Sequence, residues 1–457
     1  MARKEHDVLG EVSIPDEAFY GVNTVRAIDN FRISGHTSDR DHIYSIVTIK
    51  KAAAIANNRL GKLTNEKSEA IVTACDRILG GYHIEDFRVD IFQAGAGTSF
   101  NMNANEVIAN VALEIMGKKP GSYEFLHPND HVNMSQSTND VYPTMMRLTA
   151  MKKALRLIDE ADLLHASLKR KAEEMKGVVK PGRTHLQDAA PVTLGIELAA
   201  YAYAVSRDLR EIRSAIEYLR DLNIGGTAVG TGINTATGYQ KEVVSILSDL
   251  TGISWIPSDN LPGIMQFQSD FSRVMSSVAN LALDINKISN DIRLLYSGPG
   301  AGIHEIRIPA VQQGSSIMPG KINPSIAEAM NMISHSVLGC QQAVNYSVQA
   351  GQLELNVMMP GIDLELSRAI DIFASGLRMF RTKLIDGLEA DEESCRRHLG
   401  SSFGSAALLN PYLGYDTVAK IVQESLHTGK SIKDLALSTG KITESQYEEA
   451  MKAGIPR

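Results

Sequence analysis

Residues 274–295, VMSSVANLALDINKISNDIRLL, carry the pattern that decides the fold. Apolar residues recur there at alternating intervals of four and three, which is the a/d seam of a heptad repeat. Such a seam places one apolar stripe along a helix and predicts that this helix packs lengthwise against other helices. The seam consists of Val274, Val278, Leu281, Ile285, Ile288, Ile292 and Leu295.

Four further stretches show a similar spacing, at residues 148–175, 198–219, 330–344 and 366–384. Five long helices in one chain predict a mainly α fold with a helix bundle at its centre. The segment LAAYAYAV at residues 198–205 is apolar on more than one side, which indicates burial beyond a single seam. We therefore expect a homo-oligomer with helices packed across subunits, although a large monomeric bundle would produce the same pattern.

The periodicity also divides the chain into three expected domains. Residues 1–142 have shorter, mixed patterning, which predicts a separate and mostly helical N-terminal domain. Residues 143–394 hold the long seams and are expected to form the central bundle domain, with a distinctive loop at residues 314–324. The long periodicity then stops, so residues 395–457 are expected to form a small C-terminal helical domain.

The composition excludes several classes of protein. The chain has 457 residues, with 46 Lys and Arg against 53 Asp and Glu, and a formal net charge of −7. Without a basic tract, nucleic acid is not an expected partner. No apolar run approaches the roughly 18 residues of a membrane span, and the start of the chain lacks the apolar core of a signal peptide. We therefore expect a cytoplasmic protein with no membrane partner.

The three cysteines, Cys75, Cys340 and Cys395, form no C-x-x-C pair. Neither a disulfide framework nor a thiolate metal site is indicated by this spacing. Each cysteine is expected to be a small buried apolar residue.

Four polar segments between the apolar stretches are dense in side-chain donors, and we expect them to be loops. Their hydroxyl, amide and cationic groups offer no plausible metal cage. Several precede predicted helices, where free backbone N–H groups favour an anion. The set therefore suits a small carboxylate with more than one anionic end. The segments are GAGTSFNMN (95–103), NMSQSTND (133–140), GRTHLQD (182–188) and GSSIMPGKINP (314–324).

A structural interpretation stands beside the functional one for several of these residues. Ser, Thr and Asn before a helix are commonly N-caps, which applies to Thr98 and to Ser137, Thr138 and Asn139. His185 has the alternative role of a structural hydrogen-bonding group. For these residues the pattern alone leaves both roles open.

Three other features have mainly structural interpretations. The Gly-rich stretch at residues 224–234 lacks the G-K-[ST] ending of a phosphate loop and does not follow a predicted strand, so we interpret it as a turn. Glu106 and Glu328 fall at predicted helix starts, where they would complement the helix dipole.

The segment at residues 314–324 differs in kind from the other three. Its two serines stand between Gly314 and Gly320, which allow the backbone to hinge. Lys321 adds a positive charge, and Asn323 adds amide donors. A flap that closes a cation over an anionic substrate would need this combination.

These segments resemble a known family, the aspartase/fumarase superfamily of lyases. Residues 314–324 resemble its signature, and the resemblance covers nearly the whole chain. The other segments that carry it are EHDVLGEVSIPDEAFYGVNTVRAIDNF, GAGTSFNMNANEVIAN, HPNDHVNMSQSTNDVYPT, GRTHLQDA, GGTAVGTGINT, AGQLELNVM and LNPYLGY.

The resemblance implies an architecture and a reaction. The architecture is three mostly helical domains with a central five-helix bundle, in a homotetramer that has a twenty-helix core and active sites built from three subunits. The reaction is the elimination of ammonia from L-aspartate to give fumarate. S-T-N-D at 137–140, GAGTS at 95–99 and AGQLELNVM at 350–358 are more similar to the aspartate-cleaving members than to fumarases. No cofactor is implied, and activation by a divalent cation is left open.

Three alternatives stay open beside this reaction. Hydration of fumarate to malate would use the same fold and the same carboxylate contacts. Met359 and Met332 replace residues usual in the aspartate-cleaving members, which leaves a substituted aspartate open as the substrate. A catalytically silent scaffold is the third alternative, and it is opposed by the intact polar residues Ser315, Lys321, Asn323 and His185.

Carried onto this sequence, the resemblance assigns roles to the polar residues. The expected catalytic residues are Ser315 as the base, His185 and Lys321. Lys321 and Asn323 would hold the α-carboxylate of the substrate. The β-carboxylate would be held by Thr98, Ser137, Thr138 and Ser316, and the amino group would lie near Asn139, Thr184 and His185. A proton relay between His185 and Glu328, as in fumarases, is the alternative to the serine base. No residue is assigned to a metal.

Overall fold

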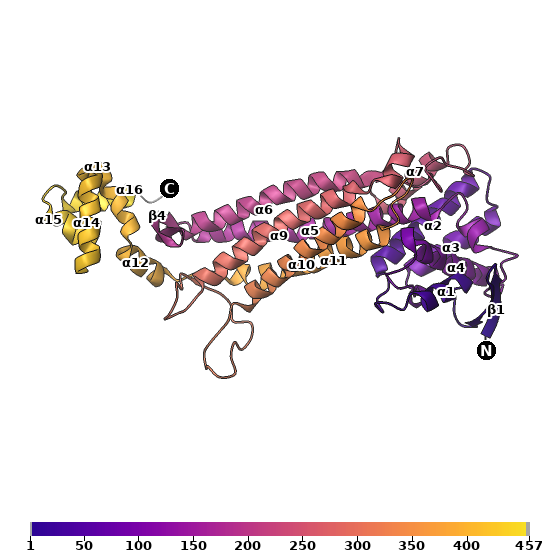
Figure 1. The fold of residues 1–457 in the computed structure, drawn as a ribbon, viewed down its shortest axis with the longest axis horizontal. Coiled ribbons are helices and arrows are strands. Elements are labelled where there is room, and N and C mark those ends of the chain that lie inside the picture. The colour runs from indigo at the N-terminus through magenta and orange to yellow at the C-terminus, as the bar shows by residue number, and fades with distance from the viewer. Residues whose placement is uncertain (1, 454–457) are drawn as a thin grey trace. The chain divides into compact units, whose positions relative to one another are not determined.

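The computed structural model describes residues 2–453 and is mainly helical (Figure 1). Its contacts divide the described chain into two compact units. Unit 1 is formed by the described parts of Met1–Ile158, Arg210–Ala279 and Ser336–Ile372. Unit 2 is formed by those of Asp159–Leu209, Asn280–His335 and Phe373–Arg457.

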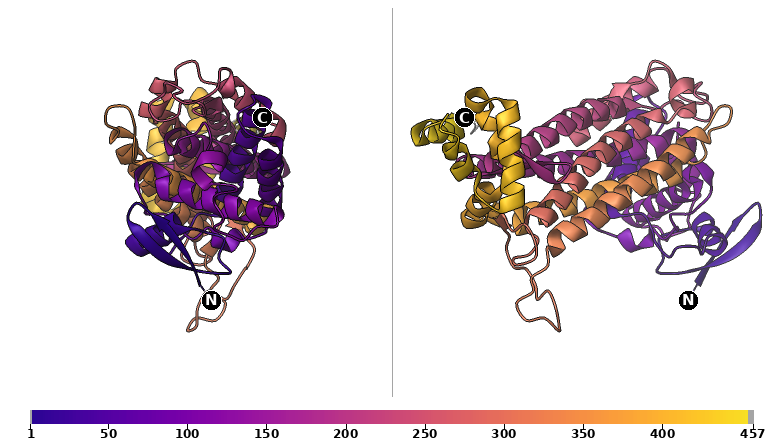
Figure 2. Two further views of the ribbon diagram at one scale, coloured as in Figure 1. Left: turned by 90° about the vertical axis from the view of Figure 1, so that its right-hand side faces the viewer. Right: turned by 60° about the vertical axis from the view of Figure 1, so that its left-hand side comes forward.

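Five long helices form the bundle that the heptad seams predict. The unit boundary falls within each of them, so each unit contains a segment of every helix, and within each unit these segments lie side by side (Figure 2). The seam residues of residues 274–295 are all buried, which confirms the predicted helix and its apolar stripe. The helices are α5 (Thr138–Glu174), α6 (Leu194–Glu217), α9 (Ser269–Leu295), α10 (Ser325–Gln349) and α11 (Met359–Lys383).

Unit 1 adds shorter elements to its share of the bundle. Two two-stranded sheets occur there, an antiparallel hairpin of β1 and β2 and a parallel pair of β5 and β6. The elements are β1 (Ala2–Asp7), β2 (Gly10–Pro15), α1 (Val22–Asn30), α2 (Arg40–Arg59), α3 (Asn65–Leu79), α4 (Thr98–Ile115), β5 (Asp221–Leu222), α7 (Tyr239–Thr251), β6 (Ile256–Pro257) and α8 (Leu261–Gln266).

Unit 2 adds two antiparallel strand pairs and a group of short helices to its share of the bundle. The short helices pack around an apolar cluster of their own that includes Leu409, Ile421, Leu435 and Ala436. The elements are β3 (Val179–Thr184), β4 (Gln187–Thr193), β7 (Ile306–Arg307), β8 (Glu389–Ala390), α12 (Glu392–Ser401), α13 (Asn410–Leu413), α14 (Tyr415–Thr428), α15 (Ile432–Ser438) and α16 (Glu444–Ala453).

Parts of three polar segments are regular structure and not the loops expected from the sequence. Residues 98–103 belong to α4 and residues 138–140 belong to α5, while residues 182–188 lie in the β3–β4 hairpin. The reason is that Ser, Thr and Asn are common in the first turn of a helix, where free backbone N–H groups need partners. The long connection between α9 and α10, which contains residues 314–324, is a loop as expected and extends from the ends of both helices (Figures 1 and 2).

Glu106 has a different role from the one expected. It lies in the middle of α4 and not at a helix start, and its buried carboxylate accepts hydrogen bonds from the start of α1. Glu106 therefore complements the dipole of a neighbouring helix. The three cysteines are free and buried, as predicted.

Candidate functional site

The predicted site residues of unit 1 gather where two helices begin. Thr98 is the first residue of α4 and Thr138 is the first residue of α5. The Asn101 side-chain amide donates to Thr138 Oγ1 at 3.0 Å and joins the two ends. Gly97 makes this approach possible, since its φ is +82° and a Cβ there would lie 2.0 Å from the ring of Tyr142 in α5. Some of the N–H groups at these starts already have partners, since Phe100 N–H donates to Gln93 Oε1 at 2.8 Å and Asn139 N–H donates to Ser137 Oγ at 3.3 Å. Two helix N-termini beside hydroxyl groups still favour an anion.

Asp140 fixes the backbone of the Ser137–Asn139 run. Its buried carboxylate accepts from the Ser137 N–H at 2.9 Å, the Gly225 N–H at 3.0 Å and the Thr227 N–H at 2.9 Å. Burial raises the pKa of Asp140 to about 6, although these amides favour the charged form. Since two amides of the Gly-rich stretch are used in this way, the stretch is a structural turn, as predicted.

Lys50 of α2 is a buried amine beside this cluster, and no pattern in the sequence pointed to it. Its Nζ donates to Asn133 Oδ1 at 2.7 Å. Burial lowers the pKa of Lys50 to about 7, against the attraction of Asp140. Lys50 lies within an apolar helical run, IVTIKKAAAIA, where a lysine usually extends to the surface, so only its tertiary position reveals it.

In unit 2, Thr184 and His185 lie at the tip of the β3–β4 hairpin. Thr184 pairs with Gln187, so His185 and Leu186 form a two-residue turn. Both turn residues have positive φ, +55° and +59°, and both are exposed. Left-handed backbone is unfavourable for such side chains and is often found at functional sites. The hairpin therefore presents His185 to solvent.

The flap at residues 314–324 holds Ser315 in a nest of amides. Ser315 Oγ accepts from the Ile317 N–H at 3.2 Å and from the Met318 N–H at 3.0 Å. Two donors at this oxygen would stabilise a serine alkoxide, the form that can act as a base. The role of Ser315 as a base stays a prediction, and these two amides are donors of the kind that it would need.

The two ends of the flap are closed against each other. The Asn323 side-chain amide donates to the Gly314 carbonyl at 2.8 Å, and a Cβ on Gly314 would lie 2.1 Å from the Lys321 carbonyl oxygen. Gly314 therefore allows the backbone at the start of the flap to lie close to the backbone of Lys321. The side-chain amide of Asn323 therefore uses one hydrogen to close the two ends of the flap. Ser316 and Lys321 are exposed on the loop.

The predicted residues divide between the two units. Unit 1 brings together Thr98, Ser137, Thr138 and Asn139, and the Asn139 side-chain amide donates to the Ala228 carbonyl at 2.8 Å. Unit 2 contains Thr184, His185, Ser315, Ser316, Lys321, Asn323 and Glu328. Glu328 lies in the first turn of α10, as the sequence predicted. Within residues 2–453 no hydrogen bond joins His185 to Glu328, so their relay stays a prediction.

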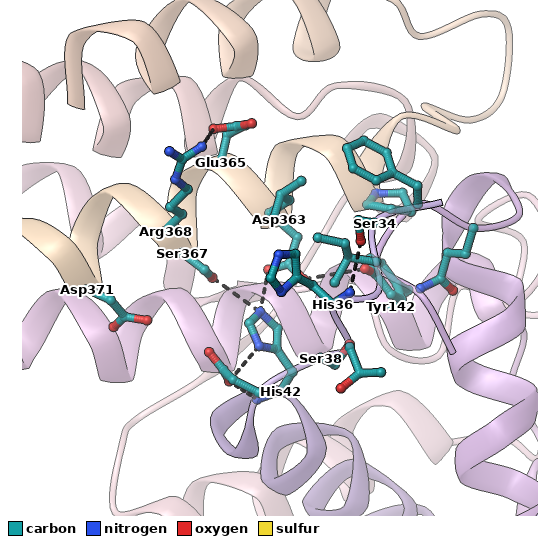
Figure 3. Close-up of a pocket in the computed structure, with 17 residues that line it drawn as sticks. Ser34, His36, Ser38, His42, Tyr142, Asp363, Glu365, Ser367, Arg368 and Asp371 are labelled. Carbon is teal, nitrogen blue, oxygen red and sulfur yellow. Dashed lines mark hydrogen bonds and ion pairs between the residues drawn. The ribbon is translucent and has the colours of Figure 1, made fainter. Parts of the chain in front are cut away.

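A cavity of about 600 Å³ lies elsewhere in unit 1 and includes none of the predicted residues (Figure 3). The buried imidazole of His42 lines this cavity. Its Nδ1 lies 2.7 Å from Asp39 Oδ1, and its Nε2 lies 3.1 Å from Asp363 Oδ1. Burial alone would lower the pKa of His42, but Asp363 and Asp39 raise it to about 10. The ring is therefore a buried cation between two carboxylates.

Replacing His42 by glutamine is expected to reduce stability more at about pH 6 than at about pH 10. A raised pKa means that the charged ring stabilises the fold fully below its ordinary pKa of 6.5 and that this contribution is lost as the pH rises through about 10. The difference in unfolding free energy should shrink by about 1.4 kcal/mol per pH unit inside that window. Urea unfolding of both proteins, with exposed His36→Gln as the control, measures it. A difference that does not change with pH would contradict this role.

Two kinds of feature are absent from the described residues. No group of three or more His, Cys, Asp and Glu side chains within that part of the chain is placed to hold a metal ion. Among its helices, none combines the length and the apolar character that crossing a membrane requires.

Comparisons with known proteins place these features in context. Residues 10–339 match the family described as Lyase, and residues 406–454 match the family described as Fumarase C C-terminus. The aspartate ammonia-lyase of Bacillus subtilis (strain 168) is 44% identical over 98% of this chain and 94% of its own length. The aspartate ammonia-lyase of Escherichia coli (strain K12) is 41% identical over the same shares of both chains.

Two solved structures are similar over nearly their full length. The fumarate lyase:delta crystallin from Brucella melitensis, bound to cobalt, has a TM-score of 0.95 at 40% identity and covers 100% of both chains. The class II fumarase from Schistosoma mansoni has a TM-score of 0.96 at 32% identity and covers 99% of both chains.

Proposed function

We propose a reaction for this chain from one premise: it belongs to the aspartase/fumarase superfamily of lyases. The reaction is the reversible anti-elimination of ammonia from L-aspartate to give fumarate, which makes the protein a carbon–nitrogen lyase. The observation that carries this proposal is the identity of 41–44% to aspartate ammonia-lyases over 98% of the chain. Enzymes of this family need no organic cofactor.

The proposed first step is removal of a proton from the carbon next to the β-carboxylate. The Ser315 alkoxide takes this proton, and the electron pair of the broken C–H bond moves into the β-carboxylate to give a dianionic aci-carboxylate. The difficulty is the stability of that dianion. Hydroxyl and N–H donors placed on its oxygens would contribute about 3 to 4 kcal/mol each, judging from the removal of single oxyanion donors. The proposed donors are Thr98, Ser137, Thr138 and Ser316.

In the proposed second step the carbon–nitrogen bond breaks. The aci-carboxylate returns its electron pair to form the carbon–carbon double bond of fumarate, and the protonated amino group leaves as ammonia with the electron pair of the broken carbon–nitrogen bond. Lys321 and Asn323 would hold the α-carboxylate, while Asn139, Thr184 and His185 would surround the leaving nitrogen. The exposed tip position of His185 supports a role toward a ligand and not toward the core of unit 2.

We also propose that the active enzyme is a homotetramer with a twenty-helix core, in which each active site takes residues from three subunits. The division of the predicted residues between two units is compatible with such a site. Support comes from large apolar side chains that one chain leaves exposed on the bundle helices: Leu155, Leu163, Ile196, Tyr203, Leu283, Met332 and Tyr346. Their burial between subunits would remove this surface from water.

The three-domain division at residues 1–142, 143–394 and 395–457 stays part of this proposal; residues 1 and 454–457 lie outside the described residues. A cytoplasmic location likewise stays a prediction from the sequence.

A parallel assay separates the candidate reactions. Ammonia release and fumarate formation are measured with L-aspartate, L-malate and N-substituted aspartates at matched concentrations. We expect L-aspartate to be turned over with a kcat/KM at least about tenfold above the others, since a site built for one leaving group discriminates against groups that leave its polar atoms unpaired. Preference for malate would establish the fumarase alternative. Preference for a substituted aspartate would establish the third candidate reaction. Of the two methionines that leave this reaction open, Met332 is 65% exposed and could contact a ligand, whereas Met359 is fully buried.

A further inference from the structure

We infer that Glu305 is a positioning residue, whose buried carboxylate holds the tip of the β3–β4 hairpin in place through Arg183. Its effect on turnover rests on the proposed function, because Thr184 and His185 are the residues that it would position. Its effect on the hairpin itself does not depend on that function.

Glu305 is the centre of a cationic cluster inside unit 2. Its carboxylate is 0% exposed and accepts a two-pronged contact from the Arg183 guanidinium, at 2.9 Å and 2.8 Å. Lys180 Nζ lies 3.1 Å from one carboxylate oxygen, and His398 Nδ1 lies 3.0 Å from the other. Burial opposes the charged form, but these partners hold the pKa of Glu305 below its ordinary value. A planar fork of this kind fixes direction as well as distance.

The backbone of Glu305 is held by two other elements. Its N–H donates to the Leu295 carbonyl at the end of α9, and its carbonyl accepts from the Asp391 N–H, both at 2.9 Å. Asp391 in turn caps α12, since its side chain accepts from the Ser394 N–H at 2.9 Å. The backbone of Glu305 is thus held between the end of α9 and the start of α12, and Glu305 directly precedes β7.

The tip of the β3–β4 hairpin has a backbone conformation that neighbouring contacts must stabilise. His185 and Leu186 adopt left-handed backbone, a strained conformation that persists only where the surroundings hold it. Arg183 stands two residues before His185 on β3. On the other strand, Asp188 Oδ2 accepts from the Phe403 N–H at 3.0 Å. Glu305 therefore anchors one side of the turn, and Asp188 anchors the other.

Hydrogen exchange tests the anchoring without reference to catalysis. In Glu305→Gln the fork loses one acceptor, so the amides of residues 179–193 are expected to exchange at least about tenfold faster than in the wild type. Glu160→Gln is the matched control, because Glu160 is 8% exposed in the same unit and accepts from Arg378 Nε at 2.7 Å. Unchanged exchange in the hairpin of Glu305→Gln, or an equal increase in Glu160→Gln, would overturn the inference.

A double-mutant comparison tests the effect on turnover. Glu305→Gln is expected to lower kcat/KM for ammonia release by about 10²-fold, the order of loss caused by a misplaced catalytic group. In a His185→Ala background the same change should cost less than about twofold, because its effect passes through the tip. An equal loss in both backgrounds would mean general disruption and would overturn the inference.

Arg183→Lys provides a second route if Glu305→Gln does not fold. This variant keeps the positive charge but loses the two-pronged contact with Glu305. It should show the same faster exchange in the hairpin and the same dependence of kcat/KM on His185. The absence of both effects would overturn the inference. If the wild type releases no ammonia from L-aspartate while the hairpin exchange responds as expected, the proposed function fails and the anchoring stands.

Discussion

Replacing Ser315 by alanine is expected to lower kcat for ammonia release by at least about 10³-fold while leaving the oligomer intact. General base catalysis contributes typically about 10² to 10⁴ in rate, and this base starts a reaction whose intermediate is very unstable. Ser315 Oγ already accepts from the Ile317 and Met318 amides, so removing it leaves two donors without a charge to stabilise. Initial rates at saturating L-aspartate and light scattering measure the two effects.

The control for this prediction is Ser297→Ala, on the same connection between α9 and α10. Ser297 Oγ donates to the Leu294 carbonyl at 2.6 Å and accepts from the Ile303 N–H at 3.1 Å. Both partners lie outside residues 314–324, so its loss should leave turnover within about twofold. Succinate, a non-reactive dicarboxylate, should still bind the Ser315→Ala protein in calorimetry. Residual turnover of Ser315→Ala within tenfold of the wild type would exclude Ser315 as the base and would favour the His185 and Glu328 relay.

Replacing Glu106 by alanine is expected to lower the free energy of unfolding by about 3 to 5 kcal/mol, since several buried donors at the start of α1 would lose their acceptor together. The Glu106 carboxylate accepts from five donors at distances of 2.6 to 3.1 Å. The donors are the backbone N–H groups of Gly21, Asn23 and Thr24, the side-chain amide of Asn23 and the hydroxyl of Thr24.

Urea unfolding at a fixed subunit concentration measures this loss, because oligomer stability depends on concentration. Glu114→Ala is the control, since Glu114 lies near the end of the same helix and contacts Arg77 and Tyr82 at the surface. Its loss should cost less than about 1 kcal/mol. Similar losses for both variants would show that Glu106 is not a special cap.

The candidate site was predictable from the sequence only in part. Thr98, Ser137 and Thr138 could be selected because hydroxyl groups before a helix are either caps or ligands, and both alternatives place them at a helix start. The amides at Ser315 Oγ could not be predicted, because they depend on how residues 315–318 turn. Lys50 and Glu305 gave no local signal, since each owes its importance to partners far away in the sequence.

The sequence by itself determined the helices and the family. Apolar spacing is a local property of the chain, so the seam at residues 274–295 specifies a helix and its buried face without knowledge of any neighbour. Only the tertiary structure decided which polar groups are charged, which groups they are hydrogen-bonded to and in which direction their side chains point. Hydrogen bonding and desolvation depend on atoms brought together from distant segments, as Asp140 shows with the amides of Gly225 and Thr227 and as Glu305 shows with Arg183.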